Sequence, residues 1–243
     1  MVLAVDIALP VLNEAGTLRA QIHRILDYTR SYSDGRVQIK MVIADNGSTD
    51  GTEAIGRELA DAHADVAFQK VDQPGVGRAL KAAWSASSAD IVGYMDLDLA
   101  TDIRHLEDVL TPLVEDRTDL AVGSRLMPGA QVIGRSAKRE FVSRTFNAIV
   151  RTVFATKFTD GMCGFKFLQR RWVETLIDCG AKSDGWFFST ELLICAEHLG
   201  LRMTDVPVRW HDDPQSKAKV SKLTFEYLSA MRKLKANLRR RTS

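Results

Sequence analysis

The chain alternates short runs of β-branched and apolar residues with segments whose apolar residues recur at helical spacing. In the first half the runs predict strands and the periodic segments predict helices. The predicted strands are Val2–Leu9, Gln38–Ala44, Val66–Val71, Ile91–Asp96 and Leu120–Gly123. The predicted helices are Glu14–Thr29, Thr52–Ala62, Gly77–Ser87 and His105–Val114. This alternation is typical of an α/β fold with a parallel sheet and right-handed crossover helices.

The second half has a more mixed pattern. It predicts the helices Lys138–Phe154, Glu191–Leu199 and Leu223–Arg241 and the strands Phe165–Leu168 and Arg202–Trp210. Polar residues fill Asp212–Val220, which is expected to form a mobile loop. We therefore expect one α/β domain over residues 1–222, followed by a basic amphipathic helix and tail over residues 223–243.

The composition is that of an ordinary globular protein, with 45% hydrophobic and 26% charged residues and a net charge of +2. This balance argues against binding of nucleic acid through bulk charge. The 3 cysteines show no CxxC spacing, so the sequence supports neither a zinc site nor a disulfide framework, and a cytoplasmic setting is expected. No apolar run reaches the roughly 20 residues that a membrane-spanning helix needs.

Three polar loops directly follow predicted strands, which is where ligands bind in parallel α/β sheets. They are Pro10–Glu14, Asp45–Thr52 and Asp96–Thr101. The second loop is rich in glycine and leads into a helix, so its backbone N–H groups could meet a polar ligand. Ordinary turn and N-cap chemistry would explain the same residues.

Asp96 and Asp98 stand two residues apart at the end of a very apolar strand. Their like charges repel each other unless a cation joins them. Mg²⁺ or Mn²⁺ takes oxygen ligands and commonly shares them with substrate phosphates. The alternative is an aspartate pair that caps the next helix.

Basic residues gather on both sides of the acidic loop along the chain. Arg78 opens a helix after Gly75-Val76-Gly77, and Arg125 follows a strand end. A further group occupies one segment and consists of Arg135, Lys138, Arg139 and Arg144. Arginine pairs bidentately with phosphate oxygens, although such residues also form solvated helix faces. Arg125 is the strongest candidate because it follows a strand end, as the acidic loop does.

Together these loops resemble those of the family-2 glycosyltransferases over nearly the whole chain. The resemblance is carried, in order, by IALPVLNE, ADNGSTDGT and GYMDLDLAT. GSRLMPGA, KREFVSRTFN and DGMCGFK narrow it to the polyprenyl-phosphate glycosyltransferases, which include the dolichyl-phosphate glucose and mannose synthases. WFFSTELL and VPVRWHDDPQSK fit the glucosyltransferase branch better than the mannose branch. The resemblance implies a GT-A fold, in which a Rossmann-like, mostly parallel sheet is flanked by helices.

The same resemblance implies roles for individual residues. Those implied for the nucleotide are Pro10, Asn13, Glu14, Asp45, Arg78 and Asp96. Asp96 and Asp98 would hold Mg²⁺ or Mn²⁺. The implied catalytic set is Asp96, Asp98, Arg125 and Glu191. Residues implied around the acceptor phosphate or the diphosphate are Arg139, Ser143, Lys166, Lys217, Lys219 and Lys222.

The implied reaction is the inverting transfer of a hexose from a nucleotide sugar, with UDP-glucose favoured, to a polyprenyl phosphate. Three positions depart from the pattern of the relatives: Asn46, Met162 and Ser189, the last of which is often aspartate. A sugar hydroxyl needs a general base, whereas a phosphate monoester with a second pKa of about 6 does not. We therefore expect an anionic acceptor, with Glu191 as a residue that positions groups.

The C-terminal segment combines basic residues with apolar residues at helical spacing. The apolar residues are Leu223, Phe225, Leu228, Met231, Leu234 and Leu238. Such a helix either rests on an anionic membrane surface or packs on the core and leaves a soluble basic tail. In the first case the protein would act peripherally on the inner face of the cell membrane, alone or with a separate membrane protein.

Other functions stay open at this point. They are a GDP-mannose-dependent polyprenyl-phosphate mannose synthase, a family-2 transferase that acts on a glycan hydroxyl, and a nucleotide-sugar-binding protein without turnover. A dinucleotide-binding oxidoreductase is disfavoured because no GxGxxG follows the first predicted strand.

Overall fold

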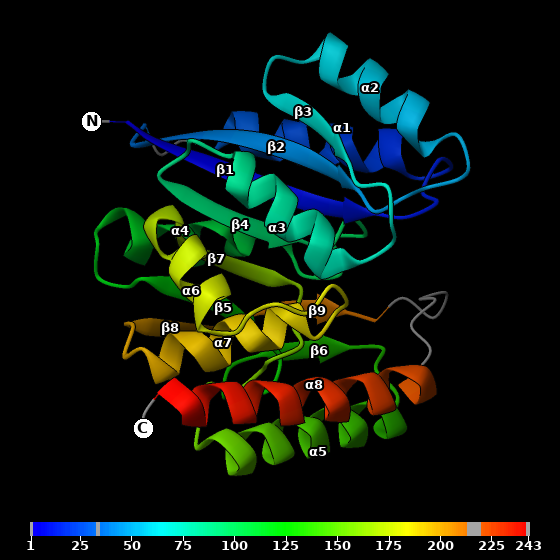
Figure 1. Ribbon diagram of the computed structural model, residues 1–243. Helices are drawn as coiled ribbons and strands as arrows, with labels where there is room; N and C mark the ends of the chain where they lie inside the picture. The colour runs from blue at the N-terminus through cyan, green and yellow to red at the C-terminus, as the bar shows by residue number, and fades with distance from the viewer. Residues whose placement is uncertain (1, 33–34, 213–219, 242–243) are drawn as a thin grey trace.

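The computed structural model describes residues 2–32, 35–212 and 220–241, and the side chains of the last range from 226 to 240. A seven-stranded sheet with the order β3-β2-β1-β4-β7-β5-β8 forms its centre (Figure 1). These strands are β1 (Leu3–Val11), β2 (Val37–Asp45), β3 (Val66–Lys70), β4 (Ile91–Met95), β5 (Leu120–Ser124), β7 (Phe165–Gln169) and β8 (Met203–Pro207). A small second sheet pairs β6 (Gln131–Ile133) with β9 (Arg209–His211).

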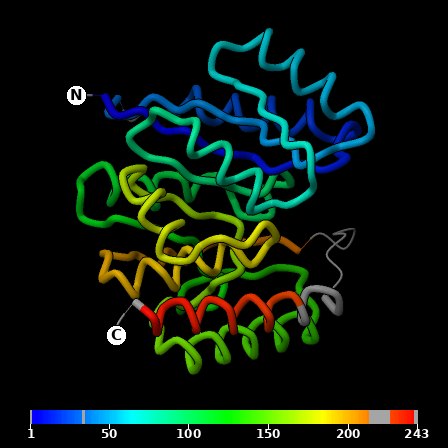
Figure 2. Tube along the Cα trace, in the orientation of Figure 1, coloured from blue at the N-terminus to red at the C-terminus, as the bar shows by residue number. Residues whose placement is uncertain are grey.

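Helices cover both faces of the large sheet. They are α1 (Leu18–Ser31), α2 (Thr52–Ala62), α3 (Val76–Ala86), α4 (Leu106–Val114), α5 (Ala137–Phe154), α6 (Val173–Cys179), α7 (Phe188–His198) and α8 (Val220–Arg241). One apolar cluster joins the sheet to α3, α6, α7 and α8, and the other joins it to α1, α2 and α4. The N-terminal part and α8 lie at opposite ends of the molecule (Figure 2).

The predicted mostly parallel sheet is confirmed. β1 pairs in parallel with β2 and β4, and β2 pairs in parallel with β3. β7 is the exception, because it runs antiparallel between β4 and β5, with Phe165 opposite Met95 and Lys166 opposite Val122. The start of β7 therefore lies beside the carboxyl ends of β4 and β5.

The second half of the chain differs from the prediction in several elements. The predicted strand Arg202–Trp210 is two strands, β8 and β9, which belong to different sheets. β6 and α6 were not predicted, because segments of 3 and 7 residues are too short for their periodicity to stand out. Residues 213–219 of the predicted loop lie outside the described residues.

The apolar face of α8 packs on the protein core. Met231, Leu234 and Leu238 are buried in the cluster that also contains residues of α7, so for them the core-packed alternative holds. Leu228 is 49% exposed. The side chains of Leu223 and Phe225 lie outside the described residues. In the described part of the chain, no helix is both long and apolar enough to span a bilayer.

Gly93 in β4 leaves room for the ring of Phe167 on β7. A Cβ at Gly93 would lie 2.1 Å from Phe167 Cδ1. We expect Gly93→Ala to lower the free energy of unfolding by about 1–3 kcal/mol, because the buried ring cannot move away without strain. Urea denaturation measures the loss. Gly16→Ala, whose Cβ would meet nothing within 4 Å, is the control, and equal losses in the two variants would contradict this account.

Candidate functional site

The three predicted loops meet at one edge of the large sheet. Asn13 follows β1, Asp45 ends β2, Asp96 follows β4 and Arg125 follows β5. These strands run in the same direction, so their carboxyl ends share an edge. The antiparallel β7 adds the segment 160–164 to this edge from the opposite direction.

The first two loops are joined by side chain to backbone hydrogen bonds. Asn13 N donates to Ser48 Oγ over 2.9 Å, and Asn13 Oδ1 accepts from Thr49 N over 2.9 Å. Glu14 N donates to Thr52 Oγ1 over 2.8 Å. Asn13 has a φ of 55°, a left-handed conformation that asparagine tolerates better than most residues. The two loops therefore form one braced unit.

Asp45 is fully buried at the base of this unit. Its Oδ1 accepts from Ser48 N over 2.9 Å, whereas Oδ2 has no hydrogen-bond partner among the described atoms. An unpaired buried acceptor costs about 1–3 kcal/mol, so this oxygen is suited to accept an N–H from a ligand. Pro10 is half-buried on β1, and Glu14 accepts a hydrogen bond from Thr17. The roles of these residues toward a nucleotide stay predictions.

A tight turn holds Asp96 and Asp98 at the end of β4. Asp96 N donates to Gly164 O over 3.1 Å, and Asp98 Oδ1 accepts from Ala100 N over 2.9 Å. Leu99 has a φ of 55°, which is unfavourable for a residue with a branched side chain. Asp96 is half-buried and Asp98 is exposed. The aspartates therefore present carboxylate oxygens at the sheet edge.

The charge balance at this turn favours a bound cation. Burial and the neighbouring charge of Asp98 raise the pKa of Asp96 to about 7, against the opposing charges of Arg125 and Lys166. A cation would relieve the repulsion between the two carboxylates. Within the described ranges, no group of three or more Asp, Glu, His or Cys side chains could hold a metal ion. The aspartates thus fit Mg²⁺ or Mn²⁺ shared with a substrate phosphate.

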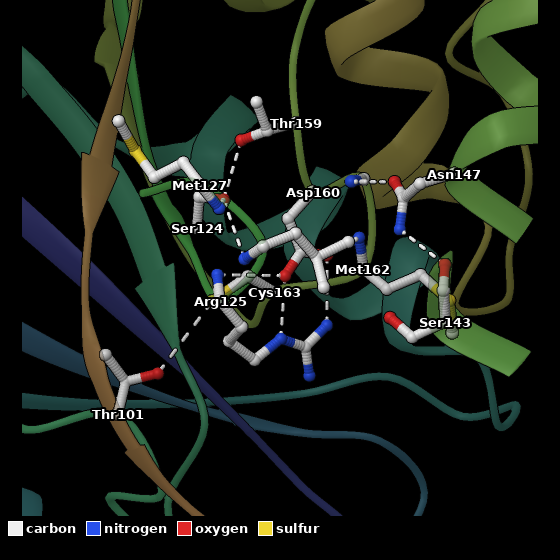
Figure 3. Close-up of polar contacts among 12 residues, drawn as sticks. Thr101, Ser124, Arg125, Met127, Ser143, Asn147, Thr159, Asp160, Met162 and Cys163 are labelled. Carbon is white, nitrogen blue, oxygen red and sulfur yellow. Dashed lines mark hydrogen bonds and ion pairs between the residues drawn. The ribbon is translucent and has the colours of Figure 1, made fainter. Parts of the chain in front are cut away.

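Arg125 is locked by a buried ion pair with Asp160 (Figure 3). Its Nε and Nη2 donate to the two carboxylate oxygens over 2.7 and 3.0 Å. Burial alone would raise the pKa of Asp160, but the charge and hydrogen bonds of Arg125 lower it to about 2. The ring of Trp210 lies 5.3 Å from the guanidinium of Arg125 and 5.5 Å from that of Arg135. Arg125 therefore has a fixed position beside the acidic turn.

The helix α5 brings further polar groups to Arg125. The Ser143 side chain projects from α5 toward the Asp160–Cys163 segment (Figure 3). Its Oγ is buried without a partner among the described atoms, as is Arg135 Nε. Arg139 forms an ion pair with Asp212, whose side chain is only 7% exposed. Two of the predicted acceptor residues, Arg139 and Ser143, thus lie on the helix beside the Arg125–Asp160 pair.

Lys166 lies inside the protein, with 1% of its surface exposed. Its ammonium donates to Cys163 O, to Gly161 O over 3.2 Å and to Tyr94 Oη over 3.4 Å. Burial lowers its pKa to about 8. Since an ammonium has three N–H donors, these contacts use all of them. Lys166 braces the segment before β7, and a direct contact with phosphate stays a prediction.

Glu191 and Arg78 both contact the segment 182–184. Glu191 accepts from Ser183 N over 2.8 Å and from Ser183 Oγ over 2.6 Å, and burial raises its pKa. Arg78 pairs with Asp184 over 2.7 Å. Gly77 permits this packing, because a Cβ there would lie 2.4 Å from Ser183 O. Both side chains therefore have structural partners, which is consistent with positioning, and their roles toward a substrate stay predictions.

Some site residues escaped the sequence analysis or lie beyond the description. Asp160, Trp210 and Asp212 were not singled out, although Asp160 begins the quoted segment DGMCGFK and the other two stand in VPVRWHDDPQSK. Their importance comes from contacts with residues at least 35 positions away, which a local pattern does not carry. Lys217 and Lys219 lie outside the described residues, as does the side chain of Lys222.

Gly164 sets the position of the Asp96 carboxylate. A Cβ at Gly164 would lie 2.0 Å from Asp96 Oδ2. We expect Gly164→Ala to turn this carboxylate away without unfolding the chain, because a side-chain end can rotate. Mn²⁺ affinity in the presence of a nucleoside diphosphate should fall roughly tenfold or more, as measured by calorimetry. Gly185→Ala meets nothing within 4 Å and is the control. Unchanged affinity in Gly164→Ala would count against Asp96 as a ligand.

Solved structures with this fold include glucosyl-3-phosphoglycerate synthase of Mycobacterium tuberculosis in complex with Mn²⁺, UDP-glucose and phosphoglyceric acid. It aligns over 96% of this chain and 80% of its own, with a TM-score of 0.66 and 19% identity. That likeness shows the fold: a GT-A glycosyltransferase architecture.

Curated proteins are similar at higher identity. Glycosyltransferase AglD of Haloferax volcanii is 34% identical over 217 residues, which cover 89% of this chain and 34% of that protein. A dolichyl-phosphate beta-glucosyltransferase of Trichomonas vaginalis is 27% identical over 87% of this chain and 65% of its own length. The chain thus spans about a third of the first relative and just under two thirds of the second. The family model described as glycosyl transferase family 2 matches residues 6–177, and the chain belongs to this family.

Proposed function

We propose that the chain is an inverting hexosyltransferase that moves a hexose from a nucleotide sugar to a polyprenyl phosphate at a membrane surface. The observation that carries this proposal is the buried Ser143 hydroxyl, which has no partner among the described atoms and points toward the segment that holds Arg125. UDP-glucose is the favoured donor. The Trichomonas vaginalis relative, a dolichyl-phosphate beta-glucosyltransferase, and the UDP-glucose in the similar solved structure support this choice.

The donor half of the site follows from the braced loops and the acidic turn. Asp45 Oδ2 accepts an N–H of the base, and Asn13 and Glu14 hold the loop against it. Asp98 together with Asp96 would hold Mg²⁺ or Mn²⁺, which supplies a Lewis acid for the departing diphosphate when bound. Arg125, fixed by Asp160, adds a preorganised positive charge beside this position.

The acceptor half suits a group that arrives already ionised. Position 189 is a serine, whose Oγ donates to Gly161 O over 3.5 Å, and the Glu191 carboxylate is held by Ser183. Neither residue is placed to remove a proton from a sugar hydroxyl. A phosphate monoester needs no such base near neutral pH, because its second pKa is about 6. Ser143 and Arg139 then orient the phosphate for attack on the anomeric carbon.

We further propose that residues 1–222 form the transferase unit and that the helix from residue 223 faces the membrane. The enzyme would act peripherally on the inner face of the cell membrane, alone or with a separate membrane protein. Lys217, Lys219 and Lys222 are proposed to add positive charge near the diphosphate. GDP-mannose as donor and a glycan hydroxyl as acceptor are the rival outcomes of the test that follows.

Transfer of radiolabel from UDP-glucose to a polyprenyl phosphate, recovered in organic solvent, tests the proposal directly. GDP-mannose and soluble glycans are run in parallel, and label in those products would replace the proposed donor or acceptor.

Asp98→Asn should lower kcat at least about a hundredfold, because several kcal/mol of charge stabilisation is lost. Asp61→Asn on the surface of α2 is the matched control. Equal activity of both variants would exclude Asp98 from catalysis.

Ser143→Ala separates acceptor binding from donor binding. A hydrogen bond to a charged group contributes about 1.5–3 kcal/mol, so the KM for the polyprenyl phosphate should rise about tenfold to a hundredfold. The KM for the nucleotide sugar should stay unchanged. Thr145→Ala, exposed on the same helix, is the control. If Ser143→Ala alters the donor KM alone, the pocket at α5 does not hold the acceptor.

A further inference from the structure

The helices α5 and α8 lie side by side along one edge of the molecule (Figure 1). The rings of Phe146 on α5 and Tyr227 on α8 have centroids 5.4 Å apart, and Tyr227 also contacts Phe187 over 5.2 Å. Val150 of α5 and Leu234 of α8 belong to the same buried cluster. Because both helices pack against this cluster, the opposite face of each helix is directed away from the protein core.

The outward face of α5 carries large apolar side chains. Phe141 is 70% exposed and Ile149, two turns later, is 42% exposed. Leu228 on α8 is 49% exposed. Phe141 is the most exposed large apolar residue recorded in the described part of the chain. A single exposed apolar residue is common in soluble proteins, so Phe141 indicates a binding surface only together with the residues on the same two helices.

The exposed charged residues of the two helices are almost all of one sign. Among described side chains, the exposed basic residues of the two helices are Lys138, Arg144, Arg151, Arg232, Lys233, Arg239 and Arg240. The exposed acidic residue there is Glu226, and the half-buried Glu140 pairs with Arg135 and Arg144. Helices that combine exposed apolar side chains with an excess of basic ones are typical of a surface that lies on an anionic bilayer.

We propose that the outward faces of α5 and α8, the α5–α8 surface, bind an anionic lipid bilayer, with Phe141 and Ile149 entering the boundary between headgroups and acyl chains. The apolar part of this membrane contact lies mainly on α5, whereas the sequence had suggested the apolar stripe of α8. The position also suits the proposed function, on which this step of the inference rests. Arg139 and Ser143 lie on the inner side of the same turns, so the acceptor pocket is about one helix diameter, roughly 10 Å, from the bilayer.

Co-sedimentation of the 243-residue chain with phosphatidylcholine vesicles, with and without phosphatidylglycerol, tests the surface. The chain should bind only the vesicles with phosphatidylglycerol. Phe141→Asp should weaken binding tenfold or more, since it removes the aromatic side chain that the bilayer would bury. Arg232→Glu with Lys233→Glu should weaken it roughly thirtyfold, at about fivefold for each basic residue removed. Leu199→Asp, exposed just after α7, and Arg24→Glu, exposed on α1, should bind as the unchanged chain does.

A second readout separates this inference from the proposed transferase activity. Phe141→Asp should still glycosylate a short, water-soluble isoprenyl phosphate and should lose activity on a long-chain acceptor in vesicles. Equal vesicle binding by Phe141→Asp and Leu199→Asp would overturn the surface and leave the activity intact. A dimer that forms without lipid and that Phe141→Asp dissociates would also overturn the inference, because the surface would then be an interface between two copies.

Discussion

The antiparallel course of β7 between β4 and β5 is the constraint on which the candidate site depends. It brings the segment 160–164 to the edge where the parallel strands end. From there Asp160 fixes Arg125, and Gly164 leaves room for the Asp96 carboxylate. Lys166, buried within β7, ties the same segment down through its carbonyl groups. Reversing one strand thus joins an acidic turn and a buried arginine that are nearly thirty residues apart in the chain.

The arginines near the proposed acceptor site are already paired with carboxylates. The pairs are Arg125–Asp160, Arg135–Glu140 and Arg139–Asp212. Desolvating an unpaired guanidinium would be costly, so each partner keeps its arginine charged and in place while the pocket is empty of substrate. Preorganised dipoles and charges of this kind need little rearrangement when a negative charge develops or an anionic group binds. The buried atoms without a partner among the described atoms here, Ser143 Oγ and Arg135 Nε, are then free to orient a phosphate.

The sequence predicted the parallel half of the fold because each strand and crossover helix shows its own periodicity. It also placed Asn13, Asp45, Asp96 and Asp98 in loops at the correct edge, since a loop that follows a parallel strand has only one edge to reach. The direction of β7, the β6–β9 pair and the inward course of Lys166 depend on contacts between distant segments. Local sequence patterns do not encode such contacts, and they do not distinguish a buried lysine from an exposed one.

The order of the strands gives the site a direction. In the strand order β2-β1-β4-β7-β5, Asp45 lies at the end of β2, Asp96 follows β4 and Arg125 follows β5. With about 4.8 Å between neighbouring strands, β2 and β5 are roughly 19 Å apart. A nucleotide sugar laid along this edge would have its base at β2, its diphosphate at β4 and its sugar toward β5. On the proposed function, the donor would then occupy this edge from the β2 end, and the acceptor phosphate would approach the donor's anomeric carbon from α5, beyond β5.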